Sequence, residues 1–164
     1  MIAPETEIGI QQNEDDPQLR DLFSFSAGGR MFAVFADHVE GTADNKRAAP
    51  LPNAPVAVLG VVCVRGRMMT VLDPVALVTG VAHTLPSELP CVVALRGDEQ
   101  LALAAETSGD TVTILATDLE PPESADNAVI AGIAQHGGEK ITVLDTKNLF
   151  FAAVQRKERR RRRF

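Results

Sequence analysis

The pattern of apolar and polar positions indicates short β-strands joined by tight turns. Phe23 and Phe25 alternate with serines, Gly28-Gly29 follows as a turn, and residues 31–35 continue as β-prone sequence, which predicts a hairpin. Apolar runs separated by turn residues predict further hairpins at 56–64 with 67–73, 91–95 with 101–105, and 129–134 with 140–145. Short strands with a turn about every ten residues are typical of an all-β barrel or sandwich.

Helix is predicted at few places. A helical turn is expected after Asp73, a short piece near 36–39, and a C-terminal helix from about Thr146 that continues toward the arginines. Residues at the start of the chain are acidic and lack periodicity, which predicts a flexible leader. The expected organisation is an acidic leader at 1–20, a folded body at 21–155 and a basic tail at 156–164.

The chain contains an internal repeat. Thr-Val-Leu-Asp at 70–73 recurs unchanged at 142–145, and at the same offset Gly66 matches Gly138. The first and third predicted hairpins resemble each other more weakly. Two copies of a β unit, each too small to bury a large core alone, are expected to pack on one another. The repeat therefore predicts two small barrels side by side, with a groove between them where a partner docks.

Composition and charge narrow the class of protein. With 164 residues, 45% of them hydrophobic and 23% charged, the chain fits one ordinary globular domain. The longest apolar run, at 54–64, is shorter than the roughly 18 residues of a spanning helix, so no membrane insertion is expected. The net charge of −6 combines an acidic body with a tail of seven basic residues and one acid. An acidic body disfavours nucleic acid as the main partner.

Candidate chemistry for catalysis or metal binding is sparse. His38, His83 and His136 lie far apart, and none stands three to five residues from another His or Cys, as a short-range metal site requires. No nucleophile elbow, phosphate loop or dinucleotide-binding pattern occurs. We therefore predict no metal, no cofactor and no enzymatic activity. Cys63 and Cys91 lie in apolar runs, where buried free thiols are expected in place of a disulfide.

Several residues allow two interpretations. Asp73 and Asp145 could form a carboxylate pair, but each follows a strand and precedes a helical turn, which favours N-capping. Arg65 is either a solvated turn residue or an interface anchor presented rigidly at a hairpin tip. Met68 and Met69 point to opposite faces of their strand, so one is expected in the core and the other exposed or at an interface.

The arginines of the tail leave three interpretations open. They form a solvated end, a helix terminus whose cations suit the helix dipole, or a contact for anionic lipid, acidic protein or RNA. The arginines concerned are Arg159, Arg160, Arg161, Arg162 and Arg163.

The second hairpin and its flanks carry a distinctive set of motifs. Leu-Pro-Asn-Ala-Pro at 51–55 precedes it, residues 60–66 read Gly-Val-Val-Cys-Val-Arg-Gly, and Thr-Val-Leu-Asp at 70–73 closes it. This resembles the signature of CheW-like domains: a proline-rich approach, a Gly-Val-x-Asn-Leu-Arg-Gly hairpin and a Val-Asp end. The likeness extends from about Leu22 to Val154. It implies an all-β fold of two intertwined SH3-like five-stranded β-barrels with a short C-terminal helix.

The resemblance also implies a function. A CheW-like protein is expected to be a non-catalytic chemotaxis adaptor that couples the cytoplasmic tip of methyl-accepting chemoreceptors to the regulatory domain of the histidine kinase CheA. It would be cytoplasmic, recruited to membrane-associated receptor arrays, and monomeric outside them. The receptor-binding residues implied by the match are Val39, Glu40, Arg65, Gly66 and Met68.

The sequence departs from the family pattern at several positions. Cys63 stands where Asn is usual, Val64 where Leu is usual, and Gly41 where Glu is common, with Glu40 one residue earlier. The arginine tail is also outside the pattern. Two alternatives therefore stay open: a divergent CheW-like scaffold of a non-motility pathway, and a small-barrel protein that binds anionic lipid or nucleic acid through its tail.

Overall fold

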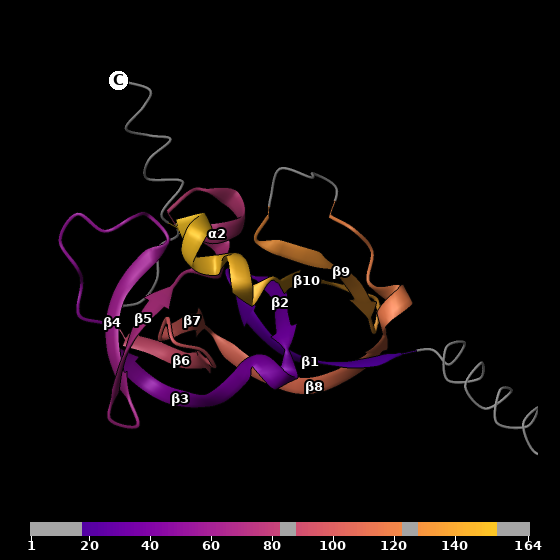
Figure 1. Cartoon of the computed structure of the whole chain (residues 1–164), viewed down its shortest axis with the longest axis horizontal. Coiled ribbons are helices and arrows are strands. Elements are labelled where there is room, and N and C mark those ends of the chain that lie inside the picture. The colour runs from indigo at the N-terminus through magenta and orange to yellow at the C-terminus, as the bar shows by residue number, and fades with distance from the viewer. Residues whose placement is uncertain (1–17, 83–87, 123–127, 154–164) are drawn as a thin grey trace, which may run out of the picture.

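The computed structural model describes residues 18–82, 88–122 and 128–153, whose strands form two curled five-stranded sheets (Figure 1). The strands are β1 (Leu19–Ala27), β2 (Arg30–Phe35), β3 (Val39–Arg47), β4 (Val58–Val64), β5 (Arg67–Leu72), β6 (Glu88–Leu95), β7 (Leu101–Ala105), β8 (Thr107–Leu115), β9 (Ile130–His136) and β10 (Glu139–Leu144). The short helical elements are η1 (Ala36–His38), α2 (Pro74–Thr79), η2 (Ala116–Asp118) and η3 (Thr146–Asn148), with helix continuing over residues 149–153.

The two sheets are built from exchanged halves of the chain. Barrel 1 has the strand order β8-β1-β2-β10-β9, and barrel 2 has the order β3-β6-β7-β5-β4. Each strand of one barrel therefore has its repeat-related strand at the same place in the other barrel. The first hairpin of each half joins the last three strands of the other half. The prediction of two small barrels side by side is confirmed, and so is the intertwined form that the family resemblance implied.

The pairing register shows the repeat at single-residue precision. Thr70 of β5 lies beside Leu101 of β7, in a parallel pairing that joins the two halves. Its counterpart Thr142 of β10 lies beside Phe32 of β2, again in parallel. The repeated Thr-Val-Leu-Asp segments therefore lie in the strands, β5 and β10, that pair with the exchanged hairpins and join them to the rest of each barrel.

Each sheet closes on itself through one further backbone bridge. Beyond β3, Ala49 exchanges two hydrogen bonds of 2.9 Å with Val61 of β4, the strand at the opposite edge of the sheet. Beyond η2, Glu120 exchanges hydrogen bonds of 2.9 and 2.8 Å with Ile133 of β9. These bridges join the first and last strands of each order, which makes both sheets barrels and leaves fewer unpaired edges.

Glycine is required beside each of these bridges. Gly60 precedes Val61 and has φ 149°, and a methyl group there would overlap the carbonyl oxygen of Ala49. Gly132, its repeat partner, precedes Ile133, and a methyl group there would lie 2.5 Å from Leu119 Cγ and 2.8 Å from the carbonyl oxygen of Glu120. The closing segment can approach its neighbour only because no side chain intervenes.

Each barrel has its own apolar interior, and the largest cluster of buried side chains lies between the barrels. In that cluster the rings of Phe25 and Phe32 stack with centroids 5.9 Å apart, and they share it with Leu103 of the other barrel. Leu77 of α2 and Leu149 of the C-terminal helix are fully buried in the same cluster. The seam between the barrels is thus filled by apolar side chains, where an open groove was expected.

Both aspartates of the repeat act as helix caps. Oδ1 of the buried Asp73 accepts a hydrogen bond of 3.0 Å from the backbone N–H of Val75, at the start of α2. Oδ1 of Asp145 accepts one of 3.0 Å from Lys147 at the start of η3. The capping interpretation is confirmed, because each carboxylate binds the first N–H groups of a helical turn.

Most predicted elements are present, and two strands were missed. The four hairpins, the turn near 36–39, α2 and the C-terminal helix lie where the sequence predicts them. The strands β3 and β8 were not predicted, because much of each faces solvent and lacks the apolar alternation of a half-buried strand. The expected leader at 1–20 falls mainly outside the described residues, and β1 begins at Leu19.

Candidate functional site

The tip of the β4–β5 hairpin is a two-residue turn made by Arg65 and Gly66. Both residues lie in the left-handed region, with φ 51° and 80°, as the turn type that matches strand twist requires. Gly66 adopts this conformation without strain because it has no Cβ. For Arg65 the same conformation costs about 1–2 kcal/mol, because its Cβ crowds the backbone. The hairpin therefore presents an arginine at its tip at the expense of some stability.

The guanidinium of Arg65 lies flat against Gly41 of β3. A methyl group built on Gly41 would lie 2.9 Å from Nη2, 3.1 Å from Cζ and 3.2 Å from Nη1 of Arg65. Because these three atoms are almost equally distant, the planar group covers the glycine face-on. The absence of a side chain at position 41 thus creates the seat in which the arginine rests.

The preceding residue of β3 is held by a second arginine of the hairpin. Nη1 of Arg67 donates to both carboxylate oxygens of Glu40, at 3.1 Å each. The two side chains are 42% and 35% exposed, so this ion pair contributes less than about 1 kcal/mol to stability. The ion pair instead fixes the position of the Glu40 carboxylate and neutralises its charge.

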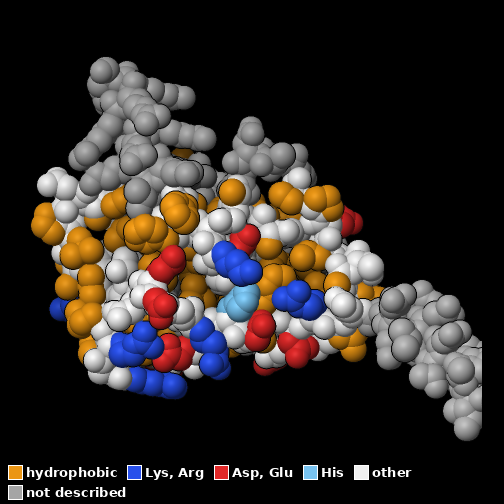
Figure 2. All heavy atoms as spheres, viewed as in Figure 1, with side chains coloured by type: hydrophobic (Ala, Val, Ile, Leu, Met, Phe, Trp, Pro, Cys, Tyr) orange, Lys and Arg blue, Asp and Glu red, His pale blue; other side chains and the backbone are white. Residues whose placement is uncertain are grey.

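A third arginine binds the first residue of β3. Nε of Arg96, which follows β6, donates a hydrogen bond of 3.2 Å to the carbonyl oxygen of Val39. The half-buried side chain of Val39 packs against the seam cluster. Three consecutive residues of β3 are therefore each contacted by one arginine. We call Arg65, Arg67 and Arg96 the arginine cluster. Figure 2 shows Lys and Arg side chains interspersed with Asp and Glu near β3 and the tip of the β4–β5 hairpin.

An apolar strip continues from the arginine cluster along the outer face of the hairpin. Met68 is 56% exposed, whereas Met69 is 1% exposed and belongs to the interior of barrel 2. The prediction that one methionine is core and the other exposed is confirmed. Met68 pairs with Cys63 across the hairpin, and the half-buried Val61 lies two residues before Cys63 on the same face.

The two cysteines differ in burial. Cys91 is buried, as predicted, and this burial raises the pKa of its thiol. Cys63 is exposed, so the prediction of a buried thiol at that position is wrong. The reason is strand alternation: Val62 and Val64 point into barrel 2, which turns Cys63 outward. Both thiols are free.

A hollow of about 410 Å³ lies beside the arginine cluster, at the edge of the seam. Arg96 and His38 line it, together with the β6–β7 turn at 97–100. His38 and Thr146, which both line the hollow, are joined by a hydrogen bond of 2.8 Å between Nδ1 and Oγ1, and this bond links η1 to η3. The predicted receptor-binding residues thus lie at one end of barrel 2, next to this hollow.

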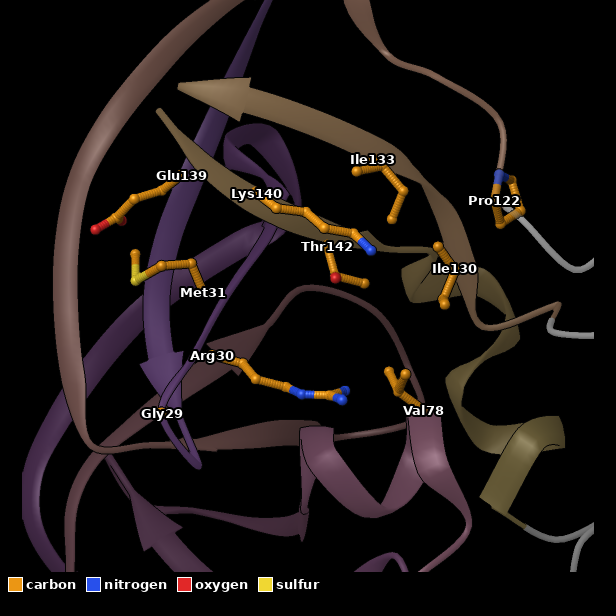
Figure 3. Close-up of a pocket in the computed structure, with 10 residues that line it drawn as sticks. All are labelled: Gly29, Arg30, Met31, Val78, Pro122, Ile130, Ile133, Glu139, Lys140 and Thr142. Atoms are coloured by element: carbon orange, nitrogen blue, oxygen red, sulfur yellow. The ribbon is translucent and has the colours of Figure 1, made fainter. Parts of the chain in front are cut away.

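A larger hollow of about 640 Å³ lies on barrel 1 and was not predicted (Figure 3). Arg30 and Lys140 extend into it beside apolar side chains, and Glu139 points away. In the described part of the chain, neither cation has a carboxylate within ion-pair distance. Each cation lies one or two residues after a Gly-Gly turn, a signal that the sequence contains. The apolar lining consists of Met31, Val78, Pro122, Ile130 and Ile133.

Two kinds of site were not found among the described residues. They contain no group of three or more His, Cys, Asp or Glu side chains arranged to hold a metal ion. Within the same ranges, no helix is long and apolar enough to cross a bilayer. The arginines 159–163, proposed as an anionic-surface contact, lie outside the described residues.

Comparison with known proteins agrees with this architecture. The sequence model of the CheW-like domain matches residues 21–153, which is most of the chain. This chain belongs to the CheW-like domain family. That family consists of chemotaxis scaffold and adaptor proteins without catalytic activity.

A solved CheW structure shows the same fold. The scaffolding protein TtCheW from Thermoanaerobacter tengcongensis superposes with a TM-score of 0.69 and is 19% identical in sequence. The match covers 81% of this chain and 93% of TtCheW. No curated protein matches the sequence. The two intertwined barrels are thus the CheW-like fold.

Proposed function

We propose that this protein is a non-catalytic adaptor that couples chemoreceptors to the regulatory domain of the kinase CheA. Membership of the CheW-like family supports this role. The observation that carries the proposal is the presence of two separate candidate docking surfaces on different barrels. An adaptor needs two such surfaces, whereas a simple binding module needs one. The adaptor would act in the cytoplasm, at membrane-associated receptor arrays.

The first surface, on barrel 2, is the proposed receptor site. Arg65, Gly66 and Glu40 lie together at the hairpin tip, with the exposed Met68 beside them. A guanidinium next to exposed apolar surface is a frequent combination at interface hot spots. Val39 contributes mainly by fixing the start of β3, because its side chain is half-buried.

The second surface, on barrel 1, is the proposed kinase site. Arg30 and Lys140 reach into the larger hollow, which is lined with apolar side chains (Figure 3). Such a mixture of apolar wall and a few charged groups suits a protein partner with both apolar and acidic residues.

The packed seam between the barrels gives this adaptor its mechanism. Because an interior at native packing density resists deformation, the two surfaces keep a set separation. Movement of a bound receptor would then be transmitted to the kinase as a change of position. A coupling of typical allosteric size, about 1–3 kcal/mol, is sufficient to change kinase activity severalfold.

Binding measured for each partner separately tests the proposal. A receptor cytoplasmic-tip fragment and the CheA regulatory domain are each titrated against Arg65→Glu and against the double variant Arg30→Glu/Lys140→Glu. Arg47→Glu, at the far end of β3 from the arginine cluster, is the charge-reversal control. We expect Arg65→Glu to weaken receptor binding at least about fivefold, or about 1 kcal/mol, and to leave kinase binding unchanged. The double variant should show the reverse pattern.

Two results would reject this assignment. Unchanged receptor affinity of Arg65→Glu would remove the first surface, and unchanged kinase affinity of the double variant would remove the second. Deletion of residues 156–164 addresses the tail alternative, since an adaptor keeps both partners while a tail-driven binder of lipid or RNA loses its target. Co-sedimentation of the protein with the receptor fragment and the regulatory domain, alone and together, then tests whether it joins them.

A further inference from the structure

Two phenylalanines are exposed side by side on the C-terminal helix. Phe150 is 47% exposed and Phe151 is 59% exposed, and their rings meet edge to face with centroids 6.1 Å apart. Another face of the same helix, at Leu149 and Ala153, is buried in the cluster between the barrels. The helix is therefore held in place by its buried face, and the two phenylalanines are left at the surface.

A dense group of cations follows this helix along the chain. The tail at 156–164 holds seven basic residues and one acid, and Arg156 stands three positions after Ala153. Three residues of extended chain span at most about 10 Å, so the first cation cannot lie far from the helix. The basic tail therefore begins next to the exposed aromatic rings.

This end of the molecule lies away from the proposed receptor site. In Figure 1 the C-terminal helix, drawn in yellow, lies at the top beside α2, whereas β3 and the tip of the β4–β5 hairpin lie at the bottom. On the face shown in Figure 2, hydrophobic side chains gather in the upper part, and most charged side chains lie below them. A surface bound at the upper end would leave the arginine cluster accessible.

We propose that Phe150, Phe151 and the basic tail form a site that binds the surface of an anionic lipid bilayer. This activity goes beyond the proposed function, because it involves neither the receptor nor the kinase. Phenylalanine side chains enter the boundary between lipid headgroups and acyl chains, and Lys and Arg are attracted to anionic headgroups. Stable attachment takes two such signals, and this end of the chain supplies both. The protein lies on the bilayer without crossing it.

The acidity of the remaining chain orients the protein on such a surface. Seven basic residues and one acid give the tail a charge of +6, so the net charge of −6 leaves −12 on residues 1–155. An anionic surface therefore attracts the tail and repels the body, which turns the phenylalanines toward the lipid. At physiological ionic strength the screening length is about 8 Å, so the repulsion of the more distant body is weak beside the contact of the tail.

The arrangement of the two rings favours lipid over single-stranded RNA. A base stacks on an open face of an aromatic ring. The edge-to-face contact of Phe150 and Phe151 places the edge of one ring against a face of the other, which removes that face from stacking. Burial in lipid needs no open ring face, because it depends on apolar area.

Sedimentation of the full chain with vesicles tests the proposal. Vesicles of phosphatidylglycerol mixed with phosphatidylcholine are compared with vesicles of phosphatidylcholine alone, at low and high salt. We expect binding to the anionic vesicles only, and we expect it to weaken as salt rises, because the attraction is electrostatic. The double variant Phe150→Ser/Phe151→Ser should bind at least about tenfold more weakly. Leu19→Ser removes a comparably exposed apolar side chain at the start of β1 and should bind as the unaltered protein does.

A second double variant separates lipid from nucleic acid. Phe150→Leu/Phe151→Leu keeps apolar side chains but removes the rings, so vesicle binding should stay within about threefold of that of the unaltered protein. Far-UV circular dichroism should show that all variants fold, since every substituted side chain is exposed.

Three results would overturn the proposal. The first is failure of the unaltered protein to bind anionic vesicles, and the second is full vesicle binding by the serine double variant. The third is loss of binding by the leucine double variant together with binding of single-stranded RNA by the unaltered protein, which would indicate base stacking. The adaptor proposal is tested separately by the receptor and kinase titrations, so either proposal can fail alone.

Discussion

Arg65 and Gly137 occupy equivalent positions in the two repeat-related hairpin turns, and both are left-handed, with φ 51° and 59°. Barrel 1 places at this position a glycine, which adopts the conformation without strain, and barrel 2 places an arginine there. The strain at Arg65 lies within the proposed receptor site. Strained residues cluster at functional sites, where the surrounding structure holds them in place.

Replacing this arginine should therefore separate stability from function. We expect Arg65→Gly to raise the free energy of unfolding by up to about 1 kcal/mol, because glycine relieves the left-handed strain. The same variant should bind the receptor fragment more weakly. Urea unfolding and a binding titration on one preparation measure the two effects, with Gly137→Ala as the opposite control that should destabilise. A variant that is both less stable and unimpaired in binding would contradict the assignment.

The buried cap of α2 should matter for stability alone. Asp73→Ala removes the acceptor of the Val75 N–H and is expected to lower the free energy of unfolding by about 1–2 kcal/mol. Asp73→Asn keeps a capping oxygen and should lose less. Denaturant titration compares the three proteins, and partner binding should be unchanged in the folded state. Loss of partner binding by folded Asp73→Ala would instead indicate a functional carboxylate.

The barrel-closing glycines provide a test of the fold. Gly132→Ala places a methyl group against Leu119 and the backbone oxygen of Glu120, and we expect a loss of about 1–3 kcal/mol. Gly41→Ala is the matched control, since the nearest atoms to its methyl group belong to the movable end of Arg65. Thermal unfolding should show a clearly lower Tm for Gly132→Ala than for Gly41→Ala. Similar Tm values would argue against the close bridge between Glu120 and Ile133.

Thiol labelling should distinguish the two cysteines. Cys63 is exposed and should react with a thiol reagent in the native protein, whereas Cys91 should react only on unfolding. Labelling of Cys63→Ser and Cys91→Ser identifies which thiol is modified. Rapid native labelling of Cys91 would contradict its burial in the middle of β6.

The raised pKa of Cys91 also predicts how stability depends on pH. Burial favours the neutral thiol in the folded state, so the unfolded thiol ionises at lower pH than the folded one. This contribution is complete below the pKa of an unfolded thiol, about 8.5, and declines as pH rises through the higher folded pKa. Urea unfolding of the unaltered protein and of Cys91→Ala across this range should show the difference.

Local patterns in the sequence were sufficient for the hairpins and for both aspartate caps. The Arg65-Gly66 and Gly137-Gly138 turns were indicated by their glycines, which adopt positive φ readily, and the repeated Thr-Val-Leu-Asp revealed the doubled unit. The exchange of hairpins could not be derived, because Thr70 meets Leu101 only through a long-range parallel pairing that no local pattern encodes. The intertwined form was expected only from the family resemblance.

The candidate site was predicted only in part, again because local patterns do not encode contacts between distant strands. Arg65 stood out because it lies at a hairpin tip. Its neighbours Arg67 and Arg96 were missed, since they become neighbours of Val39 and Glu40 only when β3 enters barrel 2. After Val39, the less exposed positions of β3 hold Gly41, Ala43 and Lys46, so the strand carries too little apolar signal to be recognised.

The exchanged hairpins also determine when each barrel can form during synthesis. Barrel 2 uses the contiguous strands β3 to β7, so it can close once Ala105 has left the ribosome. Barrel 1 combines β1 and β2 with β8 to β10, and must wait until Leu144 has emerged. In the interval, the β1–β2 hairpin has apolar residues such as Phe25 and Phe32 that can dock on the nascent barrel 2. The barrel that carries the arginine cluster is thus available first as a template for its partner.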